Sequence, residues 1–562
     1  MRECGVYAEV RPSETPASQL AGVRGLIISG GPSSVYEPGS PTVDPAIFEL
    51  GAATLGICYG QQLMAHLLGG NVKRGDKGEY GLAFLDITAP QTLLEGVNGH
   101  PQVWMSHRDT VLAVPSGFTV LGSTSTCAIA AMADPARRLY AVQFHPEVAH
   151  THPGKQILHN FLFTICGCVR DWDPSRRIPL IEEQIRHTAA GRKVFFFVSG
   201  GVDSTVAYTL CLRALGPGQV HGAYVDTGLM REEETEFVRA SFSKLGAKHF
   251  TVVDARQEFL AALEGITGPE RKRHAIGEQF VAVQDRILQS GHYLDADWIL
   301  GQGTIYPDTI ESGGTTKADV IKTHHNRVEG IQRLIEAGRI LEPLSSFYKD
   351  EVREIGRELG IGEDLLERHP FPGPGLAIRC LCGETAAAVT QLGEGWLLPV
   401  HSVGVQGDSR TYRPALALDG MPSDEHAATG LINRIEGINR VVASAASHAP
   451  LASLRASPAF ITGERLARLR RADAIVRRLS RQSGFDKTIW QFPVVVIPVG
   501  IEGKPDSVVL RPVDSVDGMT AQAVIMPASL LKQMTGELLQ VEGICAVFYD
   551  LTHKPPATIE WE

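Results

Sequence analysis

FFFVSGGVDSTV, residues 195–206, joins an apolar run to a glycine pair and a hydroxyl-rich turn, and the helix-like segment STVAYTLCLRAL follows. This order predicts a strand, a tight loop and a helix, with several backbone N–H groups at the helix N-terminus. Such amides bind phosphate. A simple glycine turn would explain the two glycines but not the whole heptad. The residues predicted to contact a nucleotide are Ser199, Gly200, Gly201, Val202, Asp203, Ser204 and Thr205.

The chemistry of this loop follows from its side chains. The absence of the GK[ST] pattern excludes an ordinary Walker A loop. Ser199, Ser204 and Thr205 offer hydroxyl donors, and Asp203 is a candidate ligand for Mg²⁺. The heptad in this setting resembles the loop of the N-type ATP pyrophosphatases. That resemblance implies cleavage of ATP between its α and β phosphates and adenylation of a carbonyl oxygen.

Strands and helices alternate on both sides of the loop. KVFFFVS, VHGAYVD, HFTVVD and WILGQG are strand-like, and they predict an α/β domain over residues 170–379. The polar segment RDWDPSRR, residues 170–177, is predicted to be a linker, and RHPFPGPGLAIR, residues 368–379, a second hinge. Residues 1–169 show the same alternation, with GLIIS and AVQF as strands. The fold class is therefore α/β and multidomain.

A second set of reactive residues lies in residues 1–169. Cys58 occupies the turn of LGICYGQQ between a predicted strand and helix, where glycines on both sides permit a sharp elbow and the helix dipole favours the thiolate. His145 and Glu147 flank a proline in QFHPEV, so that one can act as base and the other can orient it. Either fragment alone is more often structural, because free cysteines are commonly buried in cores.

These motifs, with SGGPSS upstream, resemble the class I glutamine amidotransferase family. The resemblance implies Cys58 as nucleophile, His145 as base and Glu147 as its orienter, with Gly31 and the N–H of Tyr59 as the oxyanion hole. Family members begin with a strand and a glycine-containing loop, and the sequence here starts inside the helix that follows. Two hypotheses result: a working glutaminase, or an enzyme that uses free ammonia beside an inactive, truncated glutaminase domain.

Residues 380–562 are predicted to form an α+β domain with two repeated units. HSVGVQGDSRTYRPALAL followed by LINRIEGINRVV parallels SVVLRPVDSVDGMTAQAV followed by LLQVEGICAVFYDL. The motifs VGVQGDSRTY, KTIWQFPVVVIP and KPPATIEWE, with RHPFPGPGLAIR, resemble the GMP synthetase family in its longer form. The implied reaction is XMP + ATP + glutamine + water → GMP + AMP + pyrophosphate + glutamate.

The resemblance also implies residues for XMP. Its predicted contacts are Arg273, Asp408, Gln491, Lys554 and Glu560. Arginine and lysine suit a 5′-phosphate, and carboxylates and an amide can bind the ribose and purine edges. Arg273 lies in PERKRHAIGEQF, residues 269–280, which we interpret as a mobile basic loop. Lys322 is a candidate charge for the reacting phosphate, although a solvated lysine is the simpler interpretation.

The composition of the chain argues against some classes of binding partner. The 562 residues are 43% hydrophobic, with a net charge of −10 and without a basic run, so we expect neither nucleic acid nor membrane as a partner. Nine irregularly spaced cysteines and the absence of a secretory pattern favour the cytoplasm. The Cys and His spacings predict no zinc site. We expect a monomer in which the repeated unit covers the surface of a second subunit, with a homodimer as the alternative.

Two other functions share part of this pattern. NAD synthetase has the same glycine loop, but the ending KPPATIEWE favours GMP synthetase. A non-catalytic binding protein that kept the fold is disfavoured because both the heptad and the Cys–His–Glu set are intact.

Overall fold

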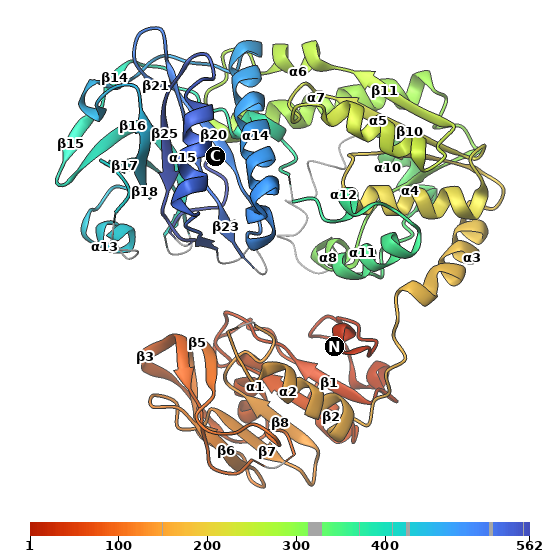
Figure 1. The fold of residues 1–562 in the computed structure, drawn as a ribbon. Helices are drawn as coiled ribbons and strands as arrows, with labels where there is room; N and C mark the ends of the chain where they lie inside the picture. Colours follow the sequence, from red (N-terminus) through yellow and green to blue (C-terminus); the bar gives the residue numbers. More distant parts are fainter. Residues whose placement is uncertain are drawn as a thin grey trace. The chain divides into compact units, whose positions relative to one another are not determined.

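The computed structural model describes residues 1–90, 92–148, 150–312, 329–369, 371–406, 409–422, 427–515, 521–554 and 556–562. The chain divides into two compact units, Met1–Asp173 and Pro174–Glu562, and each has its own hydrophobic core (Figure 1). The division falls inside the polar segment RDWDPSRR, residues 170–177.

Unit 1, Met1–Asp173, is built on a six-stranded sheet with the order β1-β2-β8-β7-β6-β4, and on a separate β3–β5 hairpin. Its strands are β1 (Gly25–Ile28), β2 (Ala53–Ile57), β3 (Asn71–Phe84), β4 (Asp86–Ile87), β5 (Gln102–Ala113), β6 (Thr119–Ser123), β7 (Ala131–Asp134) and β8 (Leu139–Val142). Its helical elements are η1 (Arg2–Cys4), η2 (Ala17–Leu20), η3 (Pro45–Glu49), α1 (Tyr59–Leu67), α2 (Gly154–His159) and η4 (Asn160–Ile165).

The parallel part of this sheet positions the reactive residues of unit 1. β1, β2 and β8 run parallel, so their carboxyl ends meet at one edge of the sheet. Cys58 follows β2 directly, and His145 lies three residues after β8. β1 is the edge strand of the sheet; the residues that precede it form η1 and η2.

The first sheet of unit 2, Pro174–Glu562, is wholly parallel, with the order β11-β10-β9-β12-β13. Its strands are β9 (Lys193–Phe197), β10 (Val220–Asp226), β11 (His249–Asp254), β12 (Trp298–Gly301) and β13 (Ile340–Leu341). The helical elements around it are η5 (Ser175–Arg177), α3 (Ile178–Ala189), α4 (Val202–Leu215), α5 (Glu234–Lys244), α6 (Arg256–Ala262), α7 (Pro269–Ser290), α8 (Tyr306–Ser312), α10 (Glu329–Glu336), α11 (Lys349–Glu358), α12 (Glu363–Leu366) and η6 (Gly375–Ile378).

The glycine loop lies at the switch point of this sheet. β9 is central, with β10 and β11 on one side and β12 and β13 on the other. The chain leaves the carboxyl end of β9 into residues 199–201 and then enters α4. Ligands of open α/β sheets bind at such a reversal of strand order.

The segment that we expected to be a mobile basic loop is helical, so that prediction is wrong. Residues 269–280 begin α7, a helix of 22 residues. Pro269 suits the first helical turn, because its missing N–H has no intrahelical partner there. Ile276 and Val283 turn into the core, and Lys272 is buried with them. The basic residues are therefore carried on a packed helix.

The second sheet of unit 2 has seven strands in the order β15-β16-β17-β18-β25-β22-β20. The strands of residues 380–562 are β14 (Ala387–Ala388), β15 (Thr390–Leu392), β16 (Gly395–Gln406), β17 (Ser409–Leu418), β18 (Arg440–Ser447), β19 (Arg455–Ala456), β20 (Val494–Ile497), β21 (Val499–Gly500), β22 (Asp506–Leu510), β23 (Val513–Asp514), β24 (Gln522–Ala523) and β25 (Ile544–Asp550). The helical elements are α13 (Ala427–Arg434), η7 (Leu451–Ser453), α14 (Gly463–Ser483), η8 (Phe485–Thr488) and α15 (Ala528–Leu538).

The two halves of this sheet have the same connectivity. β16, β17, α13 and β18 form one strand–strand–helix–strand run, and β20, β22, α15 and β25 form the other. β18 and β25 pair antiparallel at the centre. The strand correspondence that we inferred from the sequence differs, because it aligned β16 with β22. In the sheet β22 corresponds to β17, since each is parallel to the strand that follows its helix.

The two sheets of unit 2 share one core. Phe195 and Leu300 of the first sheet belong to the same buried cluster as Val441 and Val508 of the second. Figure 1 shows α14 between the two sheets, and its Arg470 donates to the carbonyl of Met230 at 2.9 Å. The predicted second and third domains thus lie in one compact unit. A boundary at residues 379/380 stays a prediction.

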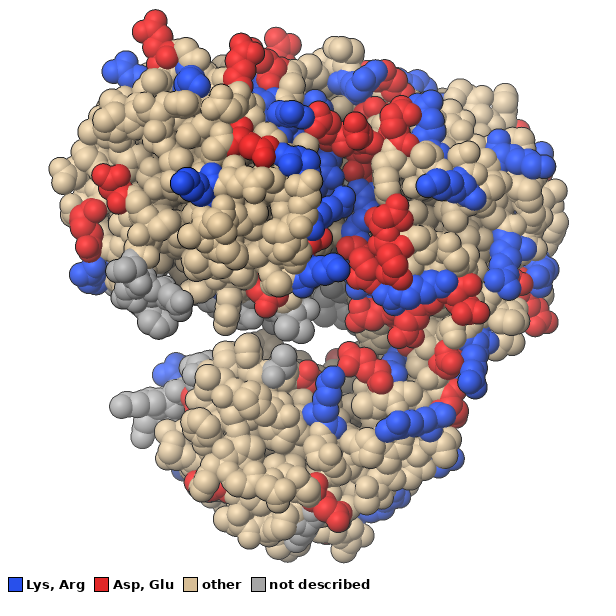
Figure 2. Space-filling model, in the orientation of Figure 1, with Lys and Arg blue, Asp and Glu red and all other residues tan. Residues whose placement is uncertain are grey.

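On the face shown in Figure 2, Lys and Arg side chains lie among Asp and Glu side chains. Within the described residues, no helix is long and apolar enough to span a membrane.

Candidate functional sites

Cys58 lies at a strained elbow. It is the N-cap of α1, with φ 53° and ψ −106°, in a region that non-glycine residues rarely adopt. The elbow needs Gly60, because a Cβ there would lie 2.0 Å from the carbonyl oxygen of Ile28. A Cβ on Gly56 would lie 2.6 Å from the Gly60 oxygen. Strain of this kind persists where the surrounding structure fixes it, as at nucleophile elbows.

His145 contacts both partners that the sequence assigned to it. Its Nδ1 lies 2.6 Å from Oε1 of Glu147, and its ring hydrogen-bonds the Cys58 side chain. Burial disfavours the charged imidazole, but the hydrogen bonds and negative charges of Cys58 and Glu147 outweigh it and raise the pKa of His145 to about 10. The imidazolium of His145 is therefore the favoured form at neutral pH.

The SGGP loop, residues 29–32, lies beside Cys58 and His145. A Cβ on Gly30 would lie 3.1 Å from Cε1 of His145 and 3.6 Å from Cβ of Cys58. Gly31 lies next to the ring of Tyr59, whose hydroxyl donates to the carbonyl of Pro41. Because Tyr59 is the first residue of α1, its N–H has no intrahelical partner. The structure thus brings together all five residues predicted for amide hydrolysis.

A buried polar group that the sequence did not reveal lies beside this site. Glu79, His107 and Cys127 each offer one atom that could bind a metal ion, and these three atoms lie within 4.8 Å of one another. Nδ1 of His107 is 2.9 Å from the carbonyl of Asp109, and its Nε2 is 3.3 Å from Glu79. Neighbouring Ser106 accepts a hydrogen bond from Sγ of Cys58 at 3.6 Å. The three side chains come from separate strands and loops, so sequence spacing could not show them together.

The glycine loop has the local geometry of an anion-binding turn. The N–H of Gly201 donates to Oγ of Ser199 at 3.2 Å, and the hydroxyl of Thr205 donates to the Gly201 carbonyl at 2.8 Å. Gly200 has φ 75°, a conformation that favours glycine. No side chain caps α4 at Gly201, so the first N–H groups of the helix are left for a ligand.

Charged residues from other elements surround Asp203. Lys349, at the start of α11, lies 3.8 Å from it. Burial and the charge of Asp308 raise the pKa of Asp203, against the opposing effect of Lys349 and Arg353. Oδ1 of Asp203 is buried and has no hydrogen-bond partner in the described structure. An orphaned carboxylate oxygen near a second carboxylate fits a magnesium ligand.

Two predicted XMP residues lie at or contact the C-terminal tail: Arg273 contacts Glu562, and Glu560 is part of the tail. Arg273 of α7 donates to the backbone oxygen of Glu562 at 2.6 Å. Arg379 binds Glu560 through two hydrogen bonds, at 3.0 and 2.7 Å. Lys272, which is fully buried, binds the carboxylate of Glu562 at 2.5 Å.

The other predicted residues are placed as follows. Gln491 is buried, and its backbone pairs with Val513 of β23. The backbone of Lys554 pairs with Ala521, next to β24. Both residues thus flank the short β23–β24 ladder. Asp408 and Lys322 lie outside the described residues.

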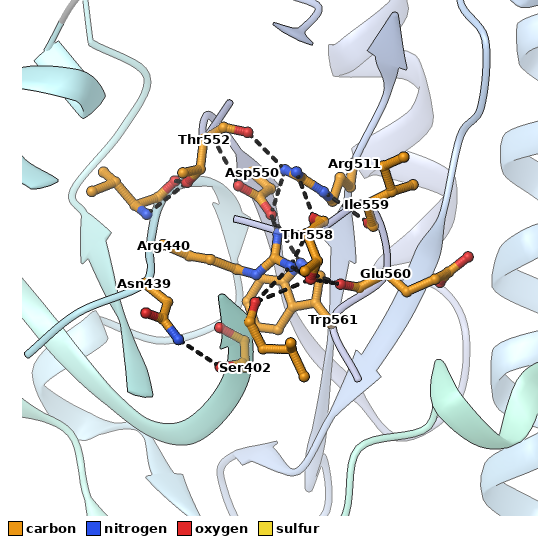
Figure 3. A network of polar contacts seen from close by, with 12 residues as sticks. Ser402, Asn439, Arg440, Arg511, Asp550, Thr552, Thr558, Ile559, Glu560 and Trp561 are labelled. Atoms are coloured by element: carbon orange, nitrogen blue, oxygen red, sulfur yellow. Dashed lines mark hydrogen bonds and ion pairs between the residues drawn. The ribbon is translucent and has the colours of Figure 1, made fainter. Parts of the chain in front are cut away.

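A buried network anchors the tail against the second sheet (Figure 3). Asp550 accepts from Arg440 at 2.8 Å and from Nε1 of Trp561 at 2.9 Å, and it pairs with Arg511 at 2.9 Å. Arg440 and Arg511 also donate to the carbonyl of Thr558, at 2.9 and 2.8 Å. The last residues of the chain are therefore held rigidly, with Glu560 turned toward Arg379.

Sequence reasoning missed four residues at these sites: Lys272, Asp308, Lys349 and Arg379. Lys272 and Arg379 lie in two segments discussed in the sequence analysis, residues 269–280 and 368–379. Asp308 and Lys349 lie in the first turns of α8 and α11. Their roles depend on the fold, because they meet partners that are distant in the chain. Lys349 contacts Asp203, 146 positions away by residue number, and Arg379 contacts Glu560, with a separation of 181 residues.

Comparison with known proteins agrees with this arrangement. Models of three families match the chain: glutamine amidotransferase class-I over residues 1–165, NAD synthase over residues 175–277, and the GMP synthase C terminal domain over residues 479–561. A probable glutamine-hydrolyzing GMP synthase of Leptospira interrogans is 42% identical, and the alignment covers 100% of this chain and 96% of that protein. The chain belongs to the glutamine-hydrolysing GMP synthase family.

A second family member extends the similarity. The GMP synthase of Symbiobacterium thermophilum is 40% identical, with 100% of this chain and 95% of that protein covered. The matched models assign a glutamine amidotransferase domain to unit 1 and an NAD synthase-like ATP pyrophosphatase domain to unit 2. The Cys–His–Glu site and the glycine loop therefore lie in the two catalytic domains of a GMP synthase.

Proposed function

We propose that unit 1 releases ammonia from glutamine and that unit 2 uses it to aminate XMP activated by ATP. The observation that carries this proposal is the presence of two candidate sites in one chain. One is the hydrogen-bonded His145–Glu147 pair beside Cys58, and the other is the Ser199–Thr205 loop at the switch point of a parallel sheet.

The glutaminase steps follow from the contacts of His145. The Cys58 thiolate attacks the side-chain amide carbon of glutamine, and the N–H of Tyr59 with the Gly31 backbone stabilises the oxyanion. The imidazolium of His145 gives its proton to the leaving nitrogen, which departs as ammonia and leaves a thioester. Neutral His145 then takes a proton from water, which attacks the thioester and releases glutamate and the thiolate.

In unit 2 the XMP carbonyl oxygen attacks the α-phosphorus of ATP, and pyrophosphate leaves. Ammonia then adds to the activated carbon, and AMP departs with the oxygen, giving GMP. Uncapped amides of α4 and the hydroxyls of Ser199 and Ser204 are suited to hold the phosphates. Lys349 adds a positive charge beside the loop. We propose that Lys322 also supplies a positive charge for the reacting phosphate.

Asp203, aided by Asp308, would hold Mg²⁺, which supplies charge neutralisation for the phosphates when bound. The buried, unpartnered Oδ1 of Asp203 supports this assignment.

For XMP we propose the tail and its neighbours. Arg273 is suited to the 5′-phosphate, and Glu560 to the purine or ribose edge. Gln491, Lys554 and Asp408 complete the proposed set. The family-implied substrates are thus ATP, XMP and glutamine. A cytoplasmic location stays a prediction.

The test of the two-site proposal is Cys58→Ala. We expect this variant to lose glutamine-dependent GMP formation by several orders of magnitude and to keep ammonium-driven GMP formation. The reason is that the thiolate acts only in unit 1. Asp203→Ala is the contrasting variant, and it should lose both activities.

The measurement is GMP formation from XMP, ATP and Mg²⁺ with either glutamine or an ammonium salt. Equal loss of both activities in Cys58→Ala contradicts the division of labour. Activity of the unmodified protein with ammonium alone supports the second hypothesis, an ammonia-dependent synthase with an inactive glutaminase domain.

We also propose that the protein is a monomer. The matching connectivity of the two halves of the seven-stranded sheet supports this, because β18 and β25 already join them within one chain. Analytical ultracentrifugation at micromolar concentration should give the mass of one chain, 60.8 kDa. A stable species of twice that mass favours the homodimer.

A further inference from the structure

One segment of unit 2 reaches both proposed substrate regions. The bridging segment, residues 368–379, is described at 368–369 and 371–379. Its first residue contacts the glycine loop, and its last residue contacts the C-terminal tail.

Arg368 clamps the glycine loop from outside. Its Nη2 binds both carboxylate oxygens of Glu234, each at 2.6 Å, and its Nη1 lies 3.4 Å from the Gly200 carbonyl. Its guanidinium carbon lies 4.8 Å from the centre of the Phe237 ring. Glu234 and Phe237 belong to α5, so Arg368 is held on that helix while it faces the loop.

The Gly200 carbonyl belongs to the peptide unit that leads into α4, whose uncapped N–H groups are proposed to bind phosphate. The carbonyl of Gly200 and the N–H of Gly201 belong to one planar peptide unit, so an interaction that fixes the first also fixes the direction of the second. Gly200 itself is packed tightly against α5, since a Cβ there would lie 2.7 Å from Cγ2 of Val238. Arg368 therefore completes a rigid support for the loop.

The other end of the bridging segment is bound to the tail. Arg379 is fully buried and binds Glu560 through two hydrogen bonds. The carbonyl oxygens of Ala377 and Cys380 accept from Nζ of Lys272, which also holds Glu562. The same tail residues are anchored by the network in Figure 3. A change at Glu560 thus acts directly on the end of the segment.

The middle of the segment is docked against the chain after β10. The N–H of Leu376 donates to the Leu229 carbonyl at 2.7 Å. The Phe371 ring contacts two guanidinium groups, those of Arg231 at 4.4 Å and Arg379 at 5.2 Å from its centre. These contacts hold residues 371–379 between the chain after β10 and the tail.

We propose that Arg368 is a positioning residue for the glycine loop, and that the bridging segment couples occupancy of the XMP site at the tail to nucleotide binding at that loop. This inference rests on the proposed function, because it takes the loop as the ATP site and the tail as the XMP site. XMP that engages Glu560 alters its pairing with Arg379, and the segment transmits the change to Arg368 and the Gly200 carbonyl. Linkage requires the effect to be reciprocal.

The experiment measures binding of α,β-methylene ATP with Mg²⁺ to the full chain by calorimetry, with and without saturating XMP. We expect XMP to tighten binding of the analogue about tenfold in the unmodified protein. In Arg368→Gln this factor should fall to about one, while XMP alone binds as before. Arg368→Lys should recover part of the factor, because its ammonium can still reach Glu234 or the Gly200 carbonyl.

Kinetics and a matched control complete the test. Arg368→Gln should raise the KM for both ATP and XMP in ammonium-driven GMP formation, because the reciprocal coupling is lost. A fraction of unfolded protein lowers only the apparent kcat and leaves both KM values unchanged. Arg357→Gln, at an exposed arginine of α11 paired with Glu363, should keep the full coupling factor.

Two results overturn the inference: a factor of about one in the unmodified protein, or a full factor in Arg368→Gln. In both cases the proposed function stands if the unmodified protein releases pyrophosphate with XMP. Absence of that release refutes the proposed function itself.

Discussion

At the scale of single residues, His145 links the geometry of unit 1 to a measurable pH dependence. Its pKa of about 10 results from the hydrogen bonds and charges of Cys58 and Glu147, which outweigh burial. Because the pKa of His145 is raised, the imidazolium is present at acidic and neutral pH. It is lost only as pH rises through about 10. The charge that we propose to protonate the leaving nitrogen therefore persists across neutral pH.

Glu147→Gln should shift this limit. The amide cannot supply the negative charge of the carboxylate, so the pKa of His145 falls and the basic limb of the glutaminase profile moves to lower pH. We expect kcat/KM for glutamine to drop by about 10²-fold at neutral pH. The measurement is the pH profile of glutamate release, with ammonium-driven GMP formation as the internal control. An unchanged basic limb shows that Glu147 does not set the charge of His145.

At the scale of elements, the buried network of Figure 3 fixes the tail against β18, β22 and β25. Arg440, Arg511 and Asp550 are fully buried, and two guanidinium groups share one carboxylate. Burial alone raises the pKa of Asp550, but the charges of Arg511 and Arg440 outweigh it and lower that pKa. The ionised network therefore stabilises the fold above the ordinary aspartate range, and this contribution is lost as pH falls through the lowered pKa.

Asp550→Asn removes the shared charge and leaves two buried cations facing a neutral amide. We expect a loss of about 3–5 kcal/mol in the free energy of unfolding at neutral pH, measured by urea denaturation of the unit 2 transition. The loss should shrink at acidic pH, where the carboxylate of the unmodified protein also becomes neutral. Glu394→Gln is the control, because its pair with Arg434 is exposed and contributes about 0–1 kcal/mol. A cost for Asp550→Asn no larger than that of the control contradicts a structural role for the network.

The elements also show what sequence alone can predict. Apolar, β-branched strands such as β9, β10 and β12 were predicted from local pattern, and so were the elbow at Cys58 and the helix after the glycine loop. α7 was not, because its first residues, PERKRH, are charged. The structure shows its inner face through the burial of Lys272, Ile276, Val283, Ile287 and Leu288. Partners such as Arg379 and Glu560, or Lys349 and Asp203, come from distant segments, and no local pattern brings them together.

At the scale of the whole molecule, the division at Asp173 and Pro174 separates the two chemistries into units with independent cores. The glycine loop, Asp203, Lys349, the bridging segment and the tail all lie in unit 2. Cys58, His145 and Glu147 all lie in unit 1. A unit that buries its own core and contains every group of one reaction is expected to fold and act by itself.

A fragment of residues 174–562 should therefore fold cooperatively and form GMP from XMP, ATP and ammonium at a rate within about tenfold of the full chain, since no group of the amination site is removed. It should form no GMP from glutamine. The measurement is GMP formation with each nitrogen source, alongside thermal unfolding of the fragment and of the full-length Cys58→Ala variant, which also lacks glutaminase chemistry but keeps unit 1. If the fragment folds yet is inactive with ammonium while Cys58→Ala is active, unit 1 contributes to amination through more than its supply of ammonia, and the two sites are not separable.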